Sequence, residues 1–454
     1  MKGRDLDELE YKSAQTPARN AAAKVLVRVW QEEAFASAAL DAELAKSRLD
    51  ARDAGLATEL CYGVLRTETA LLQKLEEVSD RFKAPSGLVK AHLLIAAFSI
   101  CFLDRIPPFA AVSEAVEASR RVADKRVGGF VNAVLRRLCT DVEKKGRPKL
   151  EDAVVATCPP WLKKALGKAV GEAHVRAYLT AGVFPPALGL CVHSAGVRAE
   201  VISRIQEALP KASVTAGVMS PHAILVRGGG DLRRLAGFGV EMIAQEEGAQ
   251  FVGLSLGAKH GERVLDACAG HGNKTWQLQH AVDGGEVHAA DVYAHKLKQI
   301  VSAAGKKPVV THVVDWSKDG SLGGAVFDRV LLDAPCSGSG TLRRRPEIGR
   351  RRTPEDVARL SDLQRTMLVN AAQCVHNGAR LVYAVCSVLR EEAEEVVEAA
   401  TALCTHRPVK LLPVPFDADV VRATFGEVAS FRLLPHEHGT DGYFAASFRV
   451  ERGS

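Results

Sequence analysis

Two cysteines that follow apolar runs are the residues best suited to chemistry in this chain. Cys336 comes three residues after Asp333, which itself follows the apolar run 330–332, and glycines come next. Cys386 ends a second apolar run at 379–386. Such runs are typical of buried parallel strands, and open α/β sheets bind ligands at the carboxyl ends of those strands. Because neighbouring strands lie about 4.8 Å apart, the pattern predicts two thiols and a carboxylate at one sheet edge.

Two thiols beside a carboxylate indicate covalent chemistry on an electron-poor ring. Carbon 5 of cytosine is a poor nucleophile until a thiolate adds to carbon 6. The adduct can then take a methyl group, and loss of the carbon 5 proton lets the thiol leave. One thiol attacks, the carboxylate near N3 stabilises the charge, and a second group assists release. A nearby cation would lower the pKa of the attacking thiol.

The alternative is that both thiols are small buried hydrophobic groups, as most free cysteines are. We interpret five cysteines within helical patterns in this way: Cys61, Cys101, Cys139, Cys374 and Cys404. Cys268 is interpreted as the lining of a ligand loop. The sequence has no Cys-x-x-Cys pair, so it predicts neither a zinc ribbon nor a redox motif, and we assign no metal ligands.

A glycine-bearing loop at 266–275 follows another expected strand. Gly270 and Gly272 let the backbone approach a ligand, and the following helix start offers unpaired amides. Asp291 ends the next strand about 20 residues later, where an acid can hold a ribose diol. Asp315, after the third strand, is a candidate for the base edge. The loop matches neither dinucleotide nor phosphate-loop patterns, so S-adenosylmethionine fits better than NAD or ATP; a solvated tight turn is the alternative.

The elements that would carry these residues divide the 454-residue chain into about three domains. Periodic apolar residues predict a helical bundle over 15–145, and mixed patterns predict a small α+β module over 150–240. Alternating strands and helices over 243–452 predict a doubly wound parallel, Rossmann-like sheet. Its expected strands are 263–268, 286–292, 309–316, 327–334 and 379–386, with a further strand at 443–450 that can run antiparallel.

Charge and hydropathy restrict the partners and the compartment. The net charge of +6 is a weak argument for nucleic acid, but arginine runs at 343–345 and 350–352 directly follow the Cys336 motif. We expect them to hold RNA; a solvated loop is the alternative. The apolar segment 93–103 is too short to span a bilayer. Ten cysteines without a signal peptide predict a reducing, cytoplasmic location and no membrane role.

The two cysteine motifs, 333–340 and 383–388, resemble those of the RNA (cytosine-5)-methyltransferases. The closest likeness is to the bacterial small-subunit (16S) ribosomal RNA methyltransferase B group. Segments 53–66 and 129–136 resemble its NusB-like RNA-binding domain, while 245–250 and 439–444 resemble the start and the final strand of its catalytic domain. The resemblance implies S-adenosylmethionine-dependent methylation of carbon 5 of one cytosine in small-subunit ribosomal RNA, naked or partly assembled. We expect a monomer that acts on neither DNA nor membranes.

The resemblance also implies roles for individual residues. Cys386 would be the nucleophile, Cys336 the thiol that helps release the product, and Asp333 the catalytic carboxylate. The implied S-adenosylmethionine contacts are Cys268, Ala269, Gly270, His271, Gly272, Asn273, Lys274, Asp291, Asp315 and Asp333.

Departures from the family pattern motivate a second hypothesis. His271 and Asn273 stand where the family loop usually has proline and glycine, and Cys191 stands where the middle module usually has arginine. A catalytically idle RNA-binding or ribosome assembly factor that kept the fold would tolerate such changes. Retention of both thiols argues against that alternative.

Overall fold

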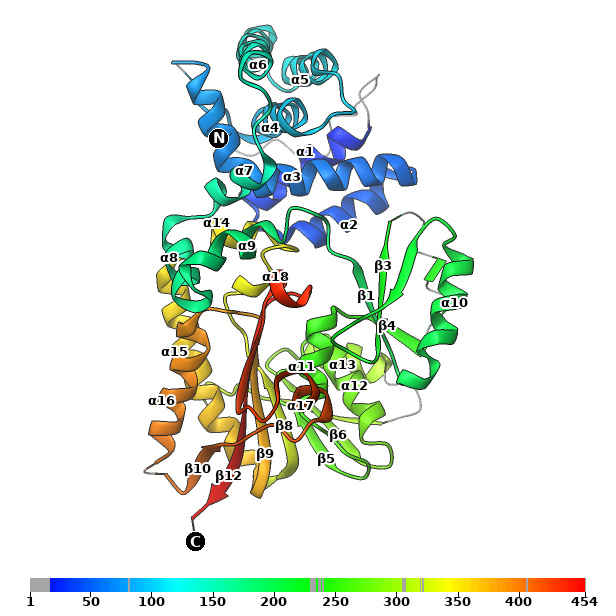
Figure 1. Ribbon diagram of the computed structural model, residues 1–454, viewed down its shortest axis with the longest axis vertical. Coiled ribbons are helices and arrows are strands. Elements are labelled where there is room, and N and C mark those ends of the chain that lie inside the picture. The colour runs from blue at the N-terminus through cyan, green and yellow to red at the C-terminus, as the bar shows by residue number, and fades with distance from the viewer. Residues whose placement is uncertain are drawn as a thin grey trace. The chain divides into compact units, whose positions relative to one another are not determined.

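The computed structural model describes residues 17–80, 82–228, 234–235, 238, 241–303, 308–318, 320, 322–405 and 407–453 (Figure 1). The chain divides into two compact units, Met1–Thr157 and Cys158–Ser454. Across these residues, no helix combines the length and apolar character needed to cross a membrane.

The first unit is the predicted helical bundle. α4 is apolar on every side and is the buried central helix, with Leu93, Leu94 and Ile95 at most 1% exposed. Two helices, α3 and α6, begin at aspartate caps. The Asp50 side chain accepts a hydrogen bond from the Asp53 amide, and the Asp124 side chain accepts one from the Val127 amide. The helices are α1 (Pro17–Gln31), α2 (Ala36–Ser47), α3 (Ala51–Glu77), α4 (Gly87–Phe102), α5 (Pro108–Val122), α6 (Lys125–Lys145) and α7 (Leu150–Thr157).

The boundary between the two units falls after α7. The basic stretch 144–149 lies inside the first unit: α6 ends at Lys145, its C-cap Gly146 has φ +82°, and residues 146–149 connect α6 to α7. α7 then packs against α3, and the Ala70 amide donates to Thr157 Oγ1 at 3.3 Å. The division therefore falls between residues 157 and 158, because α7 buries its apolar side on the bundle.

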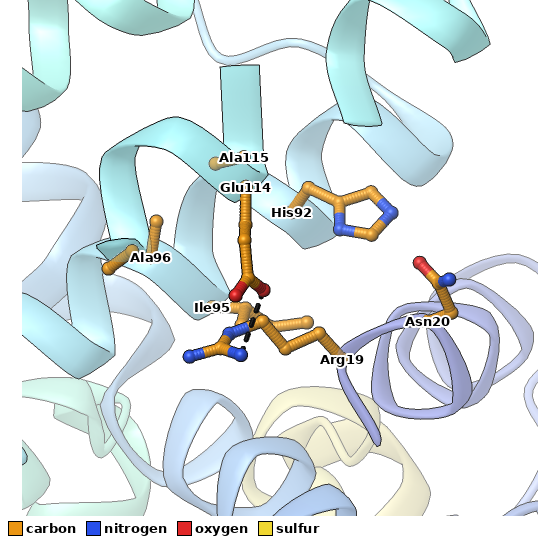
Figure 2. A pocket seen from close by; sticks show the side chains of 8 residues that line it. Arg19, Asn20, His92, Ile95, Ala96, Glu114 and Ala115 are labelled. Atoms are coloured by element: carbon orange, nitrogen blue, oxygen red, sulfur yellow. Dashed lines mark ion pairs between the residues drawn. The ribbon is translucent and has the colours of Figure 1, made fainter. Parts of the chain in front are cut away.

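A small pocket in the bundle contains buried ionisable groups (Figure 2). Arg19 of α1 pairs with Glu114 of α5, with 2.8 Å between Nη1 and Oε2. His92 of α4 faces the same pocket and is 4% exposed. Burial disfavours its charged form and Arg19 repels it, which together lower the pKa of His92 to about 4.

The helical unit should lose stability as the pH falls from about 6.5 to about 4. The unfolded chain binds a proton on His92 below its ordinary pKa near 6.5, whereas the folded chain does not until about pH 4. The free energy of unfolding should therefore fall by at most about 3 kcal/mol across this window. Hydrogen exchange of α4 in the full chain, corrected for intrinsic rates, measures the loss. His92→Gln should reduce this pH dependence, and an unchanged profile would contradict the assignment.

The second unit is built on an eight-stranded sheet in the order β10-β12-β9-β8-β5-β6-β7, with β11 paired to β12. Five neighbouring strands, β7, β6, β5, β8 and β9, are parallel. β12 runs antiparallel to β9, the direction that we considered possible for the last strand. The bounds are β5 (Arg263–Asp266), β6 (Glu286–Asp291), β7 (Val309–Val313), β8 (Phe327–Asp333), β9 (Val375–Val385), β10 (Val409–Pro413), β11 (Ser430–Leu433) and β12 (Tyr443–Arg452).

Helices cover both faces of this sheet because its central strands are apolar on both faces. Along β8, Val330 and Leu332 face one core while Leu331 faces the other. The first core includes α15 (Pro354–Ala371) and α16 (Glu394–Cys404). The second core includes α11 (Glu247–Ser255), α12 (Asn273–Ala281) and α17 (Asp419–Phe425). α13 (Ala294–Ala303) packs beside β6 and β7. The Rossmann-like prediction is confirmed.

A smaller antiparallel sheet, in the order β2-β3-β1-β4, precedes the large one. α10 (Arg198–Ala208) packs on it around a separate core that includes Val192, Ile205 and Ile224. The strands are β1 (Leu188–Val192), β2 (Ser213–Ala216), β3 (Ala223–Arg227) and β4 (Met242–Ala244). The helices α8 (Pro160–Val170) and α9 (Val175–Thr180) come before it.

Candidate active site

The two predicted thiols meet at the carboxyl ends of β8 and β9. These strands are parallel neighbours with Asp333 opposite Ala384, so Cys336 and Cys386 leave the sheet side by side. Their sulfur atoms lie 3.3 Å apart, and both side chains are half-buried. The Gly340 amide donates to the Cys386 carbonyl at 3.0 Å and closes the loop between them. The apolar strand patterns therefore correctly predicted that the Cys336 and Cys386 side chains lie together.

The two sulfur atoms are not equivalent. The hydrogen bond to Cys386 raises the pKa of the Cys336 thiol, and burial and the nearby charges of Cys386 and Glu392 raise it further. The neutral thiol form of Cys336 is therefore favoured. Its sulfur lies within hydrogen-bond distance of the Cys386 sulfur, and either sulfur can be the donor.

A lysine–aspartate pair lies beside the thiols. Lys274 Nζ, in the first turn of α12, is 2.5 Å from Asp333 Oδ2 at the end of β8. Burial opposes the lysine charge, but the carboxylate of Asp333 outweighs burial and raises the pKa of Lys274. Negative charge on Asp266 and on Cys386 favours the charged lysine as well. A neighbouring cation is one of the features that lower the pKa of a reactive cysteine.

The glycine loop after β5 has the backbone that only glycine adopts easily. Gly270 has φ +56° and Gly272 has φ +87°. A Cβ at Gly272 would lie 2.7 Å from Ile300, so a side chain there would also be crowded. The Ala269 amide donates to the Ala290 carbonyl at 2.9 Å, which holds the loop against β6. The free amides of the α12 start therefore remain at the sheet edge.

The two strand-end acids differ in their surroundings. Asp291 is 8% exposed and accepts hydrogen bonds from the Gly270 and Tyr293 amides at 3.0 and 2.9 Å. Asp315 is half-buried and accepts from Ser317. Hydrogen bonds from Ser317 and Lys318 lower the pKa of Asp315 to about 2. The next residue, Trp316, donates from Nε1 to the Ala267 carbonyl at 2.6 Å, which joins this loop to the glycine loop.

The remaining predicted loop residues have distinct environments. Cys268 is half-buried, and burial together with the charges of Asp266 and Asp333 raises the pKa of its thiol, which favours a neutral lining group. Asn273 Nδ2 donates to the Ala244 carbonyl at 2.9 Å and so ties the loop to β4. His271 is exposed, with Nδ1 3.4 Å from Gln299 Oε1.

A buried carboxylate that sequence reasoning missed holds the Cys336 loop. Glu392 is fully buried; its Oε1 accepts from the Ser337 amide at 2.7 Å and its Oε2 from Ser337 Oγ at 2.5 Å. Gln364 Nε2 donates to the same Oε1 at 3.1 Å and to the Pro335 carbonyl at 2.9 Å. Tyr383 on β9 donates to the Glu392 carbonyl at 2.7 Å. The Glu391–Glu392 pair was visible in the sequence, but nothing in its spacing indicated this contact.

Two other segments, distant in the sequence, form hydrogen bonds to the loop that follows Cys336. Tyr178 of α9 donates from its hydroxyl to the Ser339 carbonyl at 2.9 Å. The Gly442 amide, just before β12, donates to the Gly340 carbonyl at 2.7 Å. A Cβ on Gly340 would lie 2.0 Å from the Gly442 carbonyl oxygen, so the two backbones touch. No local sequence signal could have found these contacts.

Two arginines of the first run pair with buried acids. Arg343 has a side chain 11% exposed and pairs with Asp441 and Glu246. Arg344 Nε lies 3.1 Å from Asp441 Oδ2, and its Nη2 donates to the Ala187 carbonyl at 3.0 Å. Because Asp441 is 2% exposed, Arg343 and Arg344 neutralise a buried acid and join segments of the protein, whereas Arg345 is exposed. The expected RNA contact of the run stays a prediction.

A cleft of about 290 Å³ opens beside Lys274. It lies between the small sheet and the large one, and its lining is Leu188, Gly189, Ala244, Gln245, Glu246, Ala249, Asn273, Lys274 and Arg344. Cys191, where the resemblance would place an arginine, is fully buried in β1. Its side chain therefore contributes nothing to this surface.

Comparison with known proteins identifies the family. Residues 254–449 match the model of the 16S rRNA methyltransferase RsmB/F family, and residues 16–140 match the NusB family. The probable ribosomal RNA small subunit methyltransferase B of Bacillus subtilis is 30% identical over 96% of this chain and 99% of its own length. The ribosomal RNA small subunit methyltransferase B of Pseudomonas syringae pv. tomato is 32% identical, over 94% and 96%.

Two solved structures resemble this chain in fold. The crystal structure of PH0851 is 25% identical with a TM-score of 0.78, and the match covers 97% of this chain and 99% of that one. NSun6 from Pyrococcus horikoshii, solved with SFG, is 17% identical with a TM-score of 0.51 over 64% of this chain and 98% of its own, a likeness of fold alone. The chain belongs to the S-adenosylmethionine-dependent ribosomal RNA small subunit methyltransferase B family.

Proposed function

We propose that this chain methylates carbon 5 of a cytosine in small-subunit ribosomal RNA through a covalent bond between Cys386 and carbon 6 of the base. The observation that carries the proposal is the 3.3 Å separation of the Cys336 and Cys386 sulfur atoms at the ends of neighbouring strands. One-step methylation of an already nucleophilic nitrogen or oxygen would need neither thiol, whereas carbon 5 needs prior addition at carbon 6.

The side chains have separate tasks in this scheme. The Cys386 thiolate adds to carbon 6 while N3 takes up a proton, and the Asp333 carboxylate, paired with Lys274, accepts a hydrogen bond from that N3–H. The methyl group is then transferred to carbon 5. Bonding of the Cys386 sulfur to carbon 6 removes the chief cause of the raised pKa of Cys336, so its thiol can release its proton to solvent and the resulting thiolate takes the proton from carbon 5. That electron pair forms the carbon 5–carbon 6 double bond, the carbon–sulfur bond breaks, N3 releases its proton and the Cys386 thiolate is restored.

The residues at the edge of β5 and β6 fit S-adenosylmethionine. The Gly270–Gly272 turn gives a backbone cradle that a Cβ at Gly272 would disturb, and Asp291 lies where an acid can hold a ribose. We assign the contacts to Cys268–Lys274, Asp291, Asp315 and Asp333. When bound, this cofactor supplies an electrophilic methyl group on a sulfonium.

The RNA must present its target base outside the helical stack, because the thiols end in a half-buried site. The cleft beside Lys274, lined by both polar and apolar residues, would be the entrance from the side of the small sheet. The helical unit, which belongs to the NusB family by sequence, would supply binding to the RNA backbone. Arg343 and Arg344, which pair with Asp441, are left out of this RNA-binding role.

The direct test uses the purified chain, labelled S-adenosylmethionine and small-subunit ribosomal RNA that lacks the modification, both naked and in partly assembled subunits. Digestion to nucleosides and mass spectrometry should find the label in 5-methylcytidine. Label on another atom would refute the proposed chemistry. Absence of label on both substrates would favour the idle RNA-binding factor, which retains the fold without turnover.

A further inference from the structure

Three side chains far apart in the sequence come together on the second unit, away from the thiols. His174 ends a 3₁₀ turn, Glu172–His174, while His436 and Glu437 lie in α18 (Pro435–His438). One ligand atom from each residue lies within 4.8 Å of the others. α9, which follows His174, packs against α18, so the two segments are neighbours (Figure 1).

His436 is the unusual member of this cluster. Its side chain is 9% exposed, and both ring nitrogens are buried without a hydrogen-bond partner. Nε2 lies 3.5 Å from Glu437 Oε1, and the rings of His174 and Tyr178 lie 5.7 and 6.0 Å from its ring. A buried polar atom left unpaired costs about 1–3 kcal/mol, and native structures satisfy nearly all such atoms. One ring nitrogen bound to a cation would remove that cost.

We propose that His174, His436 and Glu437 bind a zinc ion. Two imidazoles and one carboxylate suit Zn²⁺, whereas Mg²⁺ and Ca²⁺ prefer oxygen ligands alone. Zinc lies about 2.0–2.2 Å from such ligands, so the three atoms must approach somewhat more closely than in the structure. His174 and Glu437 are exposed and can rotate toward the less mobile His436. Water completes the fourth position.

The ion would brace the segments that support the active-site loop. His174 and Tyr178 are one helical turn apart, and the Tyr178 hydroxyl donates to the Ser339 carbonyl between the two thiol motifs. A cation joining His174 to α18 therefore fixes the helix that holds Ser339. The role is positional, because none of the three ligands contacts Cys336 or Cys386 within the described contacts.

The test requires that the thiol pair be unable to bind the metal. The full chain, free of any affinity tag and carrying Cys336→Ala and Cys386→Ala, is stripped with a chelator and titrated with Zn²⁺ against a chromophoric competitor. We expect one ion per chain. His174→Ala should weaken binding by more than about 100-fold, since loss of mere hydrogen-bond partners of ligands already costs 10–100-fold. His376→Ala, which removes an exposed histidine of β9, is the matched control and should change nothing.

Cobalt identifies the ligands independently of affinity. Co²⁺ in the same protein should give the visible bands of a four-coordinate nitrogen and oxygen site, without sulfur charge transfer, and Glu437→Gln should alter them. Failure to bind one ion, or binding that His174→Ala leaves unchanged, would overturn the proposal. Preference for another divalent transition metal over Zn²⁺ would overturn the choice of metal.

Discussion

Cys386→Ala is expected to reduce methyl transfer by at least about 10⁴-fold, because the reaction at carbon 5 cannot begin without the thiolate. The neighbouring Cys336 sulfur lies 3.3 Å away and, in the proposed scheme, serves the elimination and not the attack. Single-turnover transfer of labelled methyl to unmodified ribosomal RNA measures the loss. Cys139→Ala, which removes a half-buried thiol from the helical unit, should retain full activity.

Cys336→Ala should have a different effect. The attacking thiol remains, but elimination loses the group that assists it, so the enzyme–RNA adduct should accumulate and survive denaturant. Denaturing electrophoresis with labelled RNA would show a shifted band for this variant and none for Cys386→Ala. The reverse pattern, with the adduct in Cys386→Ala, would exchange the two proposed roles.

Glu392→Ala is the second change with a large expected effect. It leaves the Ser337 amide, the Ser337 hydroxyl and the Gln364 amide without their buried acceptor. We expect a loss of about 3 kcal/mol in stability and a fall of about 100-fold in kcat, since small displacements of a reacting group are costly. Denaturant unfolding and steady-state kinetics measure the two effects.

Glu392→Gln provides the matched control. Its amide oxygen can still accept from the Ser337 amide and Gln364, and its NH₂ group can donate to Ser337 Oγ, so the loop should keep its position. Activity should stay within about tenfold of the starting protein. If Glu392→Ala is folded and retains kcat, the carboxylate does not position the Cys336 loop.

The sequence predicted those parts of the site that local patterns encode. Apolar runs with residues for turns at their ends located β8 and β9, and their parallel pairing placed Cys336 and Cys386 together. The strands β2, β4, β10 and β11 were not predicted; β2, for example, is mostly exposed and has no apolar run to indicate it. β9 also begins at Val375, earlier than expected, and continues through Gly378 at φ +80°.

Contacts between distant segments were beyond sequence reasoning. In the run 343–345, Arg343 and Arg344 pair with Asp441, about one hundred positions later, and no local pattern indicates this contact. Tyr178 and Glu392 hold the thiol loop from segments whose own patterns indicate only helix or loop. The packing of α7 on α3 was not predicted either, because it depends on a surface that the sequence alone does not display.

The position of β12 bears on how the protein is made. β12 lies between β9 and β10, and the backbone just before it touches Gly340 in the thiol loop. The loop that carries Cys336 therefore cannot take its final shape until residues 443–452 have been translated. At about 5–20 residues per second, this happens roughly 15–60 s after the helical unit has been translated. The helical unit can thus fold on the nascent chain well before the two thiols reach their final positions.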